Sequence, residues 1–465
     1  MWLICAIDVL VVFTLVRLAT KHGLEAALPA FVFFVTLIPG ECRIVTGVFD
    51  LYTSRLALIV LATLFLTNRK KSVIRTFPLK NLMFVHASWL LLSTLVSIVV
   101  LTSAKQFLAQ VLEYYLIYYI ILKTVTEVQT IYKLAFAMVA AVGVACLFGF
   151  LEIYAGWSVL SIFPAELQQT FGSGSTLYAE LLDRGIRARS TFPHPILFGG
   201  AISMVVPLTM YLVTTVSSRL QKVFLYVCLV VMFWNLYKTA SRGPWLATIA
   251  SLAIVLVASS RKVRKQLLAV GALASLVLLM RPGVTDTIWN TYLATLNTNT
   301  GMGMSFAYRP ALYRAVTQAL MADPLRALLG FGLGAFREKG LIIVLPTIAP
   351  HRWFTCDSAW LLLTYETGYA GVALIGLLLA RPAVMALRAY RTLPKPERYF
   401  CINCFSCLVS CFVVMISVAA YGWGQNGQML WVVIAMTVSY VALRKQERNR
   451  QAPVEPQPVD EVFAF

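Results

Sequence analysis

Long apolar runs alternate with short polar segments along most of the chain. About thirteen of these runs are long enough to cross a hydrocarbon core ~30 Å thick as helices: residues 2–18, 24–40, 52–68, 82–102, 107–123, 130–154, 194–216, 222–239, 244–259, 265–280, 358–380, 399–420 and 427–443. A helix satisfies its own backbone hydrogen bonds, as lipid requires. The pattern therefore predicts an all-α polytopic membrane protein with about 12–13 transmembrane helices.

The composition excludes a soluble protein. Hydrophobic residues make up 59% of the 465 residues and charged residues only 13%, whereas soluble domains carry about twice that share of charge. The net charge of +19 would suggest nucleic acid as a partner of a soluble protein. Here the Lys and Arg residues cluster in short loops between apolar runs, which is the pattern that orients membrane proteins. We therefore expect membrane lipids, and no nucleic acid, as partners.

The basic loops predict the orientation of the chain. They lie at residues 69–80, 261–265, 381–398 and 444–450, and positive loops face the cytoplasm. Alternation of the spans then places two longer loops, 155–193 and 281–357, on the outer side. If one of the first two runs lies in the interface, the count becomes twelve and the N-terminus moves inside.

These segments divide the chain into four predicted parts. Residues 1–154 form N-terminal transmembrane helices, and residues 155–380 form a core that carries both outer loops. Residues 381–443 form C-terminal transmembrane helices. Residues 444–465, which are rich in Pro, Asp and Glu from Gln451 onward, are expected to form a disordered cytoplasmic tail.

The outer loop 281–357 contains the signature of an amphipathic helix. Pro310 suits a first helical turn, and Asp323-Pro324 suits a stop. The apolar positions between them share one helical face: Leu312, Ala315, Val316, Ala319 and Leu320. We expect this helix to lie on the membrane or against the bundle. The glycines of the following GxGxG run, Gly330, Gly332 and Gly334, predict a tight turn, because no strand precedes them as a dinucleotide loop would require.

Four cysteines have a spacing close to that of iron–sulfur ligands. Cys401, Cys404, Cys407 and Cys411 form CxxCxxCxxxC, but they fall on one stripe of an apolar helix. A cluster-binding loop has to wrap around its metal ions. The sequence therefore favours small packing residues or a palmitoylated surface, and we expect neither a metal nor a cofactor.

Three arginines share a predicted position at the start of an outer-side helix. Arg189 precedes Pro193-His194-Pro195 and a span, Arg242 precedes Gly243-Pro244 and a span, and Arg309 precedes Pro310. Helix N-termini present free amides and the positive end of a dipole to anions. Arginine adds a planar fork that donates paired hydrogen bonds to phosphate oxygens. Together the three could hold a diphosphate, although an interfacial arginine on its own often only reaches toward lipid headgroups.

Several ionisable residues could act as a base. Asp357 begins a span at the outer surface, where a carboxylate could take a proton from a hydroxyl or only cap the helix. His351 and His194 are the two histidines of the outer loops, and Glu366 is a candidate supporting residue. Charged groups in or beside spans are costly unless paired or hydrated, and those of this sequence include Glu113, Glu152, Lys238, Asp357 and Glu366.

Over residues 185–380 the sequence resembles the O-antigen ligase and polymerase family. Four motifs carry the resemblance: RSTFPHPILFGG from Arg189, ASRGPWLA from Ala240, RPALYRAVTQALMADP from Arg309 followed by LLGFGLGAFRE, and DSAWLLLTYETGYAGV from Asp357. The resemblance implies a GT-C-like bundle in a bacterial inner membrane, with its active site facing the periplasm. It also implies a metal-independent glycosyltransferase in which Arg189, Arg242 and Arg309 bind the diphosphate of an undecaprenyl-linked glycan donor.

One departure from the family pattern bears on the type of transfer. Family ligases carry a His-Asn pair where this chain has Asp357-Ser358, and His351 lies six residues upstream. The change favours a polymerase of O-antigen or exopolysaccharide repeats, with a glycan or lipid-linked acceptor, over a ligase acting on lipid A core. A flippase for lipid-linked oligosaccharide and a non-catalytic scaffold are the alternatives. A chain-length regulator or an export complex would be the expected protein partner.

Overall fold

The computed structural model describes most of the chain. It covers residues 2–47, 49–68, 72–168, 186–259, 301–345, 348–395, 397–422 and 424–451, with short pieces at 264–265, 289–290, 292–293 and 296–297. The predicted span 265–280 lies outside the described residues, apart from Lys265, and so does the end of the tail, 452–465. The middle of the first outer loop, 169–185, also lies outside them.

The first part of the chain is a series of helices. They are α1 (Trp2–His22), α2 (Leu24–Leu37), α3 (Thr53–Thr67), α4 (Lys80–Leu95), α5 (Val100–Gln110), α6 (Leu116–Thr124) and α7 (Val128–Tyr154). A π-helical turn, Val111–Tyr115, joins α5 to α6, and two 3-10 turns, Val159–Ile162 and Ala165–Leu167, follow α7. The two-residue strands β1 (Arg43–Ile44) and β2 (Leu51–Tyr52) pair antiparallel between α2 and α3.

The second part adds longer helices and one β-hairpin. The helices are α9 (Pro195–Thr215), α10 (Arg219–Lys238), α11 (Arg242–Ala258), α14 (Gly301–Met321), α15 (Pro324–Leu329), α16 (Ala335–Lys339), α17 (Ala359–Thr392), α18 (Glu397–Ser417) and α19 (Gly424–Gln451). A 3-10 turn, Ala420–Gly422, precedes α19. Strands β3 (Leu341–Leu345) and β4 (Ile348–Trp353) form an antiparallel pair in which Ile343 faces His351.

The structure confirms an all-α polytopic membrane protein. Within the described residues, seven helices are long and apolar enough to cross a membrane: α1, α7, α9, α10, α17, α18 and α19. Three shorter apolar helices, α2, α3 and α11, coincide with further predicted spans. Helix α19 continues to Gln451, so the first residues of the predicted tail, 444–451, are helical.

The predicted span 82–102 is wrong in its extent. Helix α4 ends at Leu95 and α5 begins at Val100. Between them the backbone bonds to an outer segment, because the N–H of Ile98 donates to the carbonyl of Phe331 at 3.1 Å. The guanidinium of Arg326 also donates to the carbonyl of Val96 at 2.7 Å. Hydrogen bonds from distant residues thus end α4 where the apolar pattern continues.

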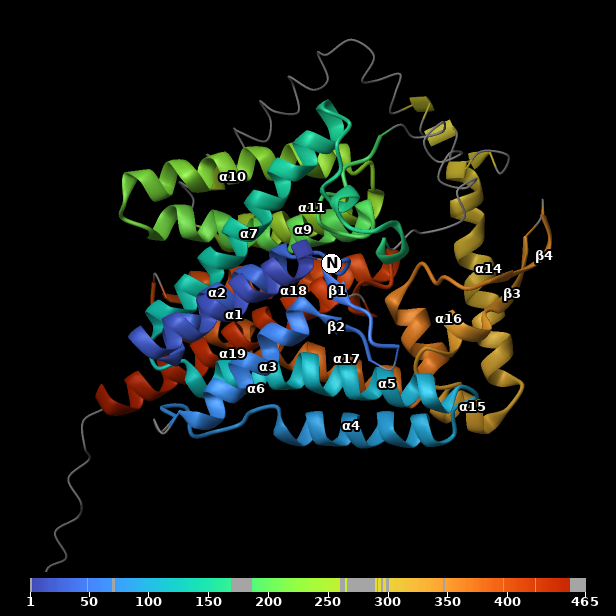
Figure 1. Ribbon diagram of the computed structural model, residues 1–465, viewed down its shortest axis with the longest axis horizontal. Helices are drawn as coiled ribbons and strands as arrows, with labels where there is room; N and C mark the ends of the chain where they lie inside the picture. The colour runs from blue at the N-terminus through green and yellow to red at the C-terminus, as the bar shows by residue number, and fades with distance from the viewer. Residues whose placement is uncertain are drawn as a thin grey trace, which may run out of the picture.

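The helices form one bundle with a small outer layer at one end. Figure 1 shows the bundle helices lying roughly along the long axis, with α14, α16 and the β3–β4 hairpin at the right-hand end and the last turns of α19 leaving at the left. The outer layer has its own apolar core, in which Leu312, Val316 and Leu320 of α14 pack with Phe336 and Ile343. The predicted amphipathic face is thus confirmed, and it packs against protein.

The long helix α17 breaks at Gly368, where φ is 72° and ψ is 177°. The break frees backbone carbonyls, and other segments satisfy them. Phe331 N–H donates to Tyr365 O at 3.0 Å, Gly332 N–H to Glu366 O at 2.9 Å, and Trp89 Nε1 to Thr367 O at 3.0 Å. A broken helix at membrane depth requires such partners. The predicted GxGxG turn is confirmed, and its backbone N–H groups bond to the carbonyls that the break leaves without helical partners.

Candidate active site

The segments that carry the predicted arginines and Asp357 come together at the outer-layer end of the bundle. Helices α7, α10 and α18 end there, whereas α9, α11 and α17 begin there (Figure 1). The described parts of the basic segments, 72–80, 381–395 and 444–450, lie at the opposite end, where α17 ends and α18 begins. The helix directions alone therefore place the loop before α9, the start of α11 and the start of α17 at the same end of the bundle.

A buried carboxylate positions Arg189. Glu152, in the last turn of α7, is 7% exposed. It accepts hydrogen bonds from the backbone N–H groups of Arg189 and Ser190, both at 2.8 Å, and from Nε of Arg189 at 3.1 Å. One carboxylate therefore holds the backbone and the side chain of Arg189 together, and the remaining guanidinium nitrogens stay available to a ligand.

A second arginine ties the Arg189 loop to the start of α11. Arg187 is buried and donates from Nε to Thr239 O and from a terminal nitrogen to Ser241 Oγ, both at 2.8 Å. The neighbouring N–H of Ala188 donates to Lys238 O at 3.1 Å. Ser241 is the residue before Arg242, which is the first residue of α11 and is exposed. The prediction of a helix start at Arg242 is therefore confirmed, and Arg187 fixes this start beside the Arg189 loop.

The Arg189 loop and the segment before α11 each contain a residue with an unusual backbone conformation. Among the described residues, the non-glycine residues with positive φ are Ser190 (56°) and Ala240 (47°). Such conformations cost about 1–3 kcal/mol and persist where the surroundings enforce them, which is common at functional sites. Ser190 directly follows Arg189, and Ala240 lies two residues before Arg242.

The end of α18 brings the start of α17 to the same place. A Cβ atom on Gly243 would lie 2.0 Å from Oγ of Ser417, so the start of α11 packs tightly on the last turn of α18. The N–H of Ala359 donates to Val418 O at 3.2 Å, and Ser358 Oγ contacts Met415 O at 3.4 Å. Ser358, and not Asp357, caps α17 by accepting from the N–H of Leu361. Asp357 thus lies outside the helix, one residue before its N-cap.

Arg309 lies within α14 and not at a helix start, since α14 begins at Gly301 and Pro310 is inside it. The preceding residue, Tyr308, donates its hydroxyl to Thr355 O at 2.7 Å. Burial raises the pKa of Tyr308 well above its usual range, and the charge of Asp357 raises it further. Nε of Arg309 is buried and has no hydrogen-bond partner among the described residues.

Three other predicted residues have different surroundings. His194 is the N-cap of α9 and accepts from the N–H of Ile196 through Nδ1 at 3.2 Å. His351 is exposed on β4, with its ring edge-on to Trp353 at 5.7 Å. Glu366 is buried, and its carboxylate accepts from the N–H groups of Gly334 and Phe336. His194 and Glu366 thus have structural partners in the folded chain.

Sequence reasoning missed some residues that build this site. Glu152 stood out only as an ionisable residue in an apolar run, Tyr308 only as one of several aromatic residues that could stack on sugars, and Arg187 carried no signal. In the described part of the chain, no group of three or more His, Cys, Asp or Glu side chains could hold a metal ion. The four cysteines of α18 are free and buried in the bundle core, as expected for packing residues.

Replacing Glu152 by Gln should weaken the site without removing an arginine. The amide keeps the size of the side chain but loses the charge that pairs with Arg189, and breaking a buried pair costs about 3–5 kcal/mol. We expect a lower unfolding temperature and a loss of Arg189-dependent activity. Thermal unfolding of the purified protein measures the first effect. Glu166→Gln is the control, because Glu166 is exposed and should change neither; equal behaviour of the two variants would contradict this role of Glu152.

The comparison with known families agrees with the predicted resemblance. No curated protein matches the chain. Residues 227–376 match the family described as O-antigen ligase. The match includes Arg242, Arg309, His351, Asp357 and Glu366, and it begins after Arg189 and His194. Together with the membrane helices, it supports an O-antigen ligase or polymerase type of function in polysaccharide biosynthesis, on lipid-linked glycans. Residues 227–376 of this multi-pass membrane protein are thus similar to the O-antigen ligase family.

Proposed function

We propose that this protein polymerises glycan repeat units carried on undecaprenyl diphosphate, at the periplasmic face of a bacterial inner membrane. The hydroxyl oxygen of an acceptor glycan attacks the anomeric carbon of the donor glycan. The bond from that carbon to the diphosphate oxygen breaks, and its electron pair leaves with the diphosphate. The hydroxyl proton passes to a base of the protein.

The observation that carries this proposal is the convergence of the Arg189 loop, the start of α11 and the start of α17 on the end of α18. Arg189 and Arg242 lie on the first two of these segments. Arg309 follows Tyr308, which bonds to the segment before Asp357. Charge-assisted contacts to the leaving diphosphate would stabilise the charge that develops in the transition state.

Asp357 is the better of the two candidate bases. It precedes the Ser358 cap, and its neighbours Ser358 and Ala359 contact the end of α18. His351 lies on β4 of the outer layer, and its side chain is exposed. A base must reach the reacting hydroxyl within hydrogen-bond distance, which favours the residue beside the arginine-bearing segments.

A ligase is the second candidate, because the matched family is described as O-antigen ligase. Donor activation by the arginines would be the same, and only the acceptor would differ, with lipid A core in place of a growing glycan. The Asp357-Ser358 pair in place of the family His-Asn pair supports the polymerase.

The decisive experiment is reconstitution of the full-length protein in liposomes with undecaprenyl-diphosphate-linked repeat units. A ladder of products from the wild type, lost in Asp357→Asn and kept in His351→Gln, is the expected result. Transfer of a single glycan to added lipid A core, without a ladder, would make the protein a ligase. No covalent product with either acceptor would overturn the glycosyltransferase proposal and favour transport.

A further inference from the structure

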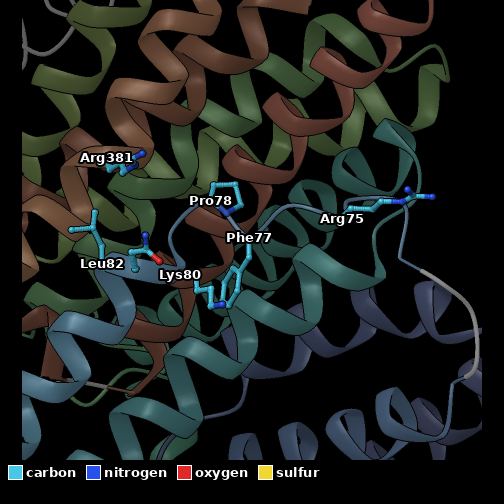
Figure 2. A pocket seen from close by; sticks show the side chains of 7 residues that line it. Arg75, Phe77, Pro78, Lys80, Leu82 and Arg381 are labelled. Atoms are coloured by element: carbon cyan, nitrogen blue, oxygen red, sulfur yellow. The ribbon is translucent and has the colours of Figure 1, made fainter.

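Two neighbouring cavities open at the end of the bundle opposite to the candidate active site. One of about 400 Å³ lies between the loop before α4 and Arg381 of α17. The other, of about 490 Å³, continues along α17. Leu82 and Arg381 line both cavities. Figure 2 shows Arg381 and Leu82 on one side, Arg75 on the other, and Phe77, Pro78 and Lys80 between them.

The loop that forms the first cavity is firmly built. The ammonium group of Lys123 donates to the carbonyls of Ile74, Arg75 and Thr76, at 2.9, 3.1 and 3.1 Å. Phe77 stacks on Tyr118 with ring centroids 5.9 Å apart. These contacts use the carbonyls of the loop and bury Ile74, so the side chain of Arg75 is left exposed toward the surface.

The cations that line the cavities are uncompensated. Arg75, Lys80, Arg381 and Arg388 are all exposed, and no ion pair joins any of them to a carboxylate in the described part of the chain. At the same end of the bundle Arg444 pairs with Glu397 at 3.1 Å, so carboxylates are present there but are used elsewhere. The cavities therefore carry a local excess of positive charge, which complements an anion.

The second cavity offers an apolar surface beside these cations. Four residues that line the second cavity recur at intervals of three to four positions and therefore share one face of α17: Leu377, Arg381, Val384 and Arg388. Leu377 is 58% exposed and Val384 is 45% exposed. A ligand that combines a phosphate with hydrocarbon chains would meet the arginines and the apolar side chains in turn along this face.

We propose that these two cavities bind an anionic phospholipid. Its phosphate lies against Lys80 and Arg381, and one acyl chain lies along Leu377 and Val384 in the groove between α4 and α17. Basic pockets between transmembrane helices on the side of the basic loops recognise anionic headgroups in this way. The site is independent of the proposed glycan chemistry, because it lies at the other end of the bundle.

The test measures lipid binding to the delipidated full-length protein. Native mass spectrometry monitors the bound lipid during titration with phosphatidylglycerol or phosphatidylcholine. The wild type should bind one phosphatidylglycerol at least tenfold more tightly than phosphatidylcholine. The double variant Lys80→Gln/Arg381→Gln should lose affinity for phosphatidylglycerol by about 25-fold, roughly fivefold for each charge. All the altered side chains are exposed, so the unfolding temperature should stay the same.

Two controls separate this site from general electrostatic attraction. Arg391→Gln/Lys395→Gln removes two exposed charges from the same end of the bundle, outside the cavities, and should change the affinity by less than about threefold. Leu377→Asn/Val384→Asn keeps every charge and should still weaken lipid binding. Equal losses in the two charge variants would overturn the proposal. So would displacement of the lipid by millimolar inorganic phosphate, which would indicate a site for a soluble anion.

Discussion

Arg242→Ala should lower polymer formation by the reconstituted protein by about 100-fold or more, while the protein remains folded. Arg242 is exposed at the first position of α11, beside the Arg189 loop that Arg187 fixes in place. Under the proposed function it meets the leaving diphosphate together with the free amides of the helix start. Removing one donor that stabilises developing negative charge commonly costs 10²–10³ in rate. The rate of ladder formation at saturating donor measures this effect.

The chain supplies a closely matched control in Arg219. Arg219 is exposed and is the first residue of α10, preceded by Ser218 as Arg242 is preceded by Ser241. It lies at the far end of α10, about 30 Å along the helix at 1.5 Å per residue. Arg219→Ala should therefore leave the rate unchanged. An equal loss in both variants would mean that Arg242 acts through stability or lipid contact, and would remove its role in donor binding.

Much of the fold follows from the pattern of the sequence, because a membrane leaves few alternatives. Apolar runs become helices since their backbone has no other hydrogen-bond partners in lipid. The Asp323-Pro324 stop also follows from local chemistry, and Asp323 caps α15 by accepting from the N–H of Leu325 at 2.9 Å. The three positive-φ glycines of the GxGxG run adopt conformations that other residues rarely accept.

The break between α4 and α5 could not be predicted in this way. Residues 96–99 are mostly apolar, and the bonds that end α4 come from Phe331 and Arg326, more than 200 residues away. The helix start expected at Arg309 was also wrong, because α14 continues through Pro310. Pro310 is exposed, so its missing N–H and the carbonyl it leaves unpaired cost less there than inside the bundle.

The candidate site was only partly predictable. The helix starts near Arg189 and Arg242 follow from proline and glycine positions, but the residues that join them do not. Glu152 and Arg187 act through contacts 37 and 52 residues apart in sequence, which no local pattern encodes. The roles of Arg189, Arg242, Arg309 and Asp357 in catalysis, and the GT-C-like arrangement of the helices, remain predictions.

Gly368→Ala should destabilise the protein by about 3 kcal/mol or more and abolish activity. At φ 72° a side chain is strained, which costs about 1–3 kcal/mol. A Cβ atom there would also lie 2.0 Å from the carbonyl oxygen of Leu328, so α15 would have to move away from α17. That movement would disrupt the bonds from Phe331 and Gly332 to the broken turn. Thermal unfolding in detergent should show a clearly lower midpoint.

Gly376 of the same helix shows why this effect belongs to the break and not to glycine itself. A Cβ atom on Gly376 meets nothing within 4 Å, and Gly376 has regular helical geometry. Gly376→Ala should therefore leave the midpoint unchanged or raise it, since alanine stabilises a helix interior by up to about 1 kcal/mol relative to glycine. If Gly368→Ala kept the wild-type midpoint, α17 would have to be straight and the outer layer loosely attached. The first turns of α17 would then be held only by the end of α18 and no longer by the GxGxG turn, and Asp357 would lose part of the support that places it beside the arginine-bearing segments.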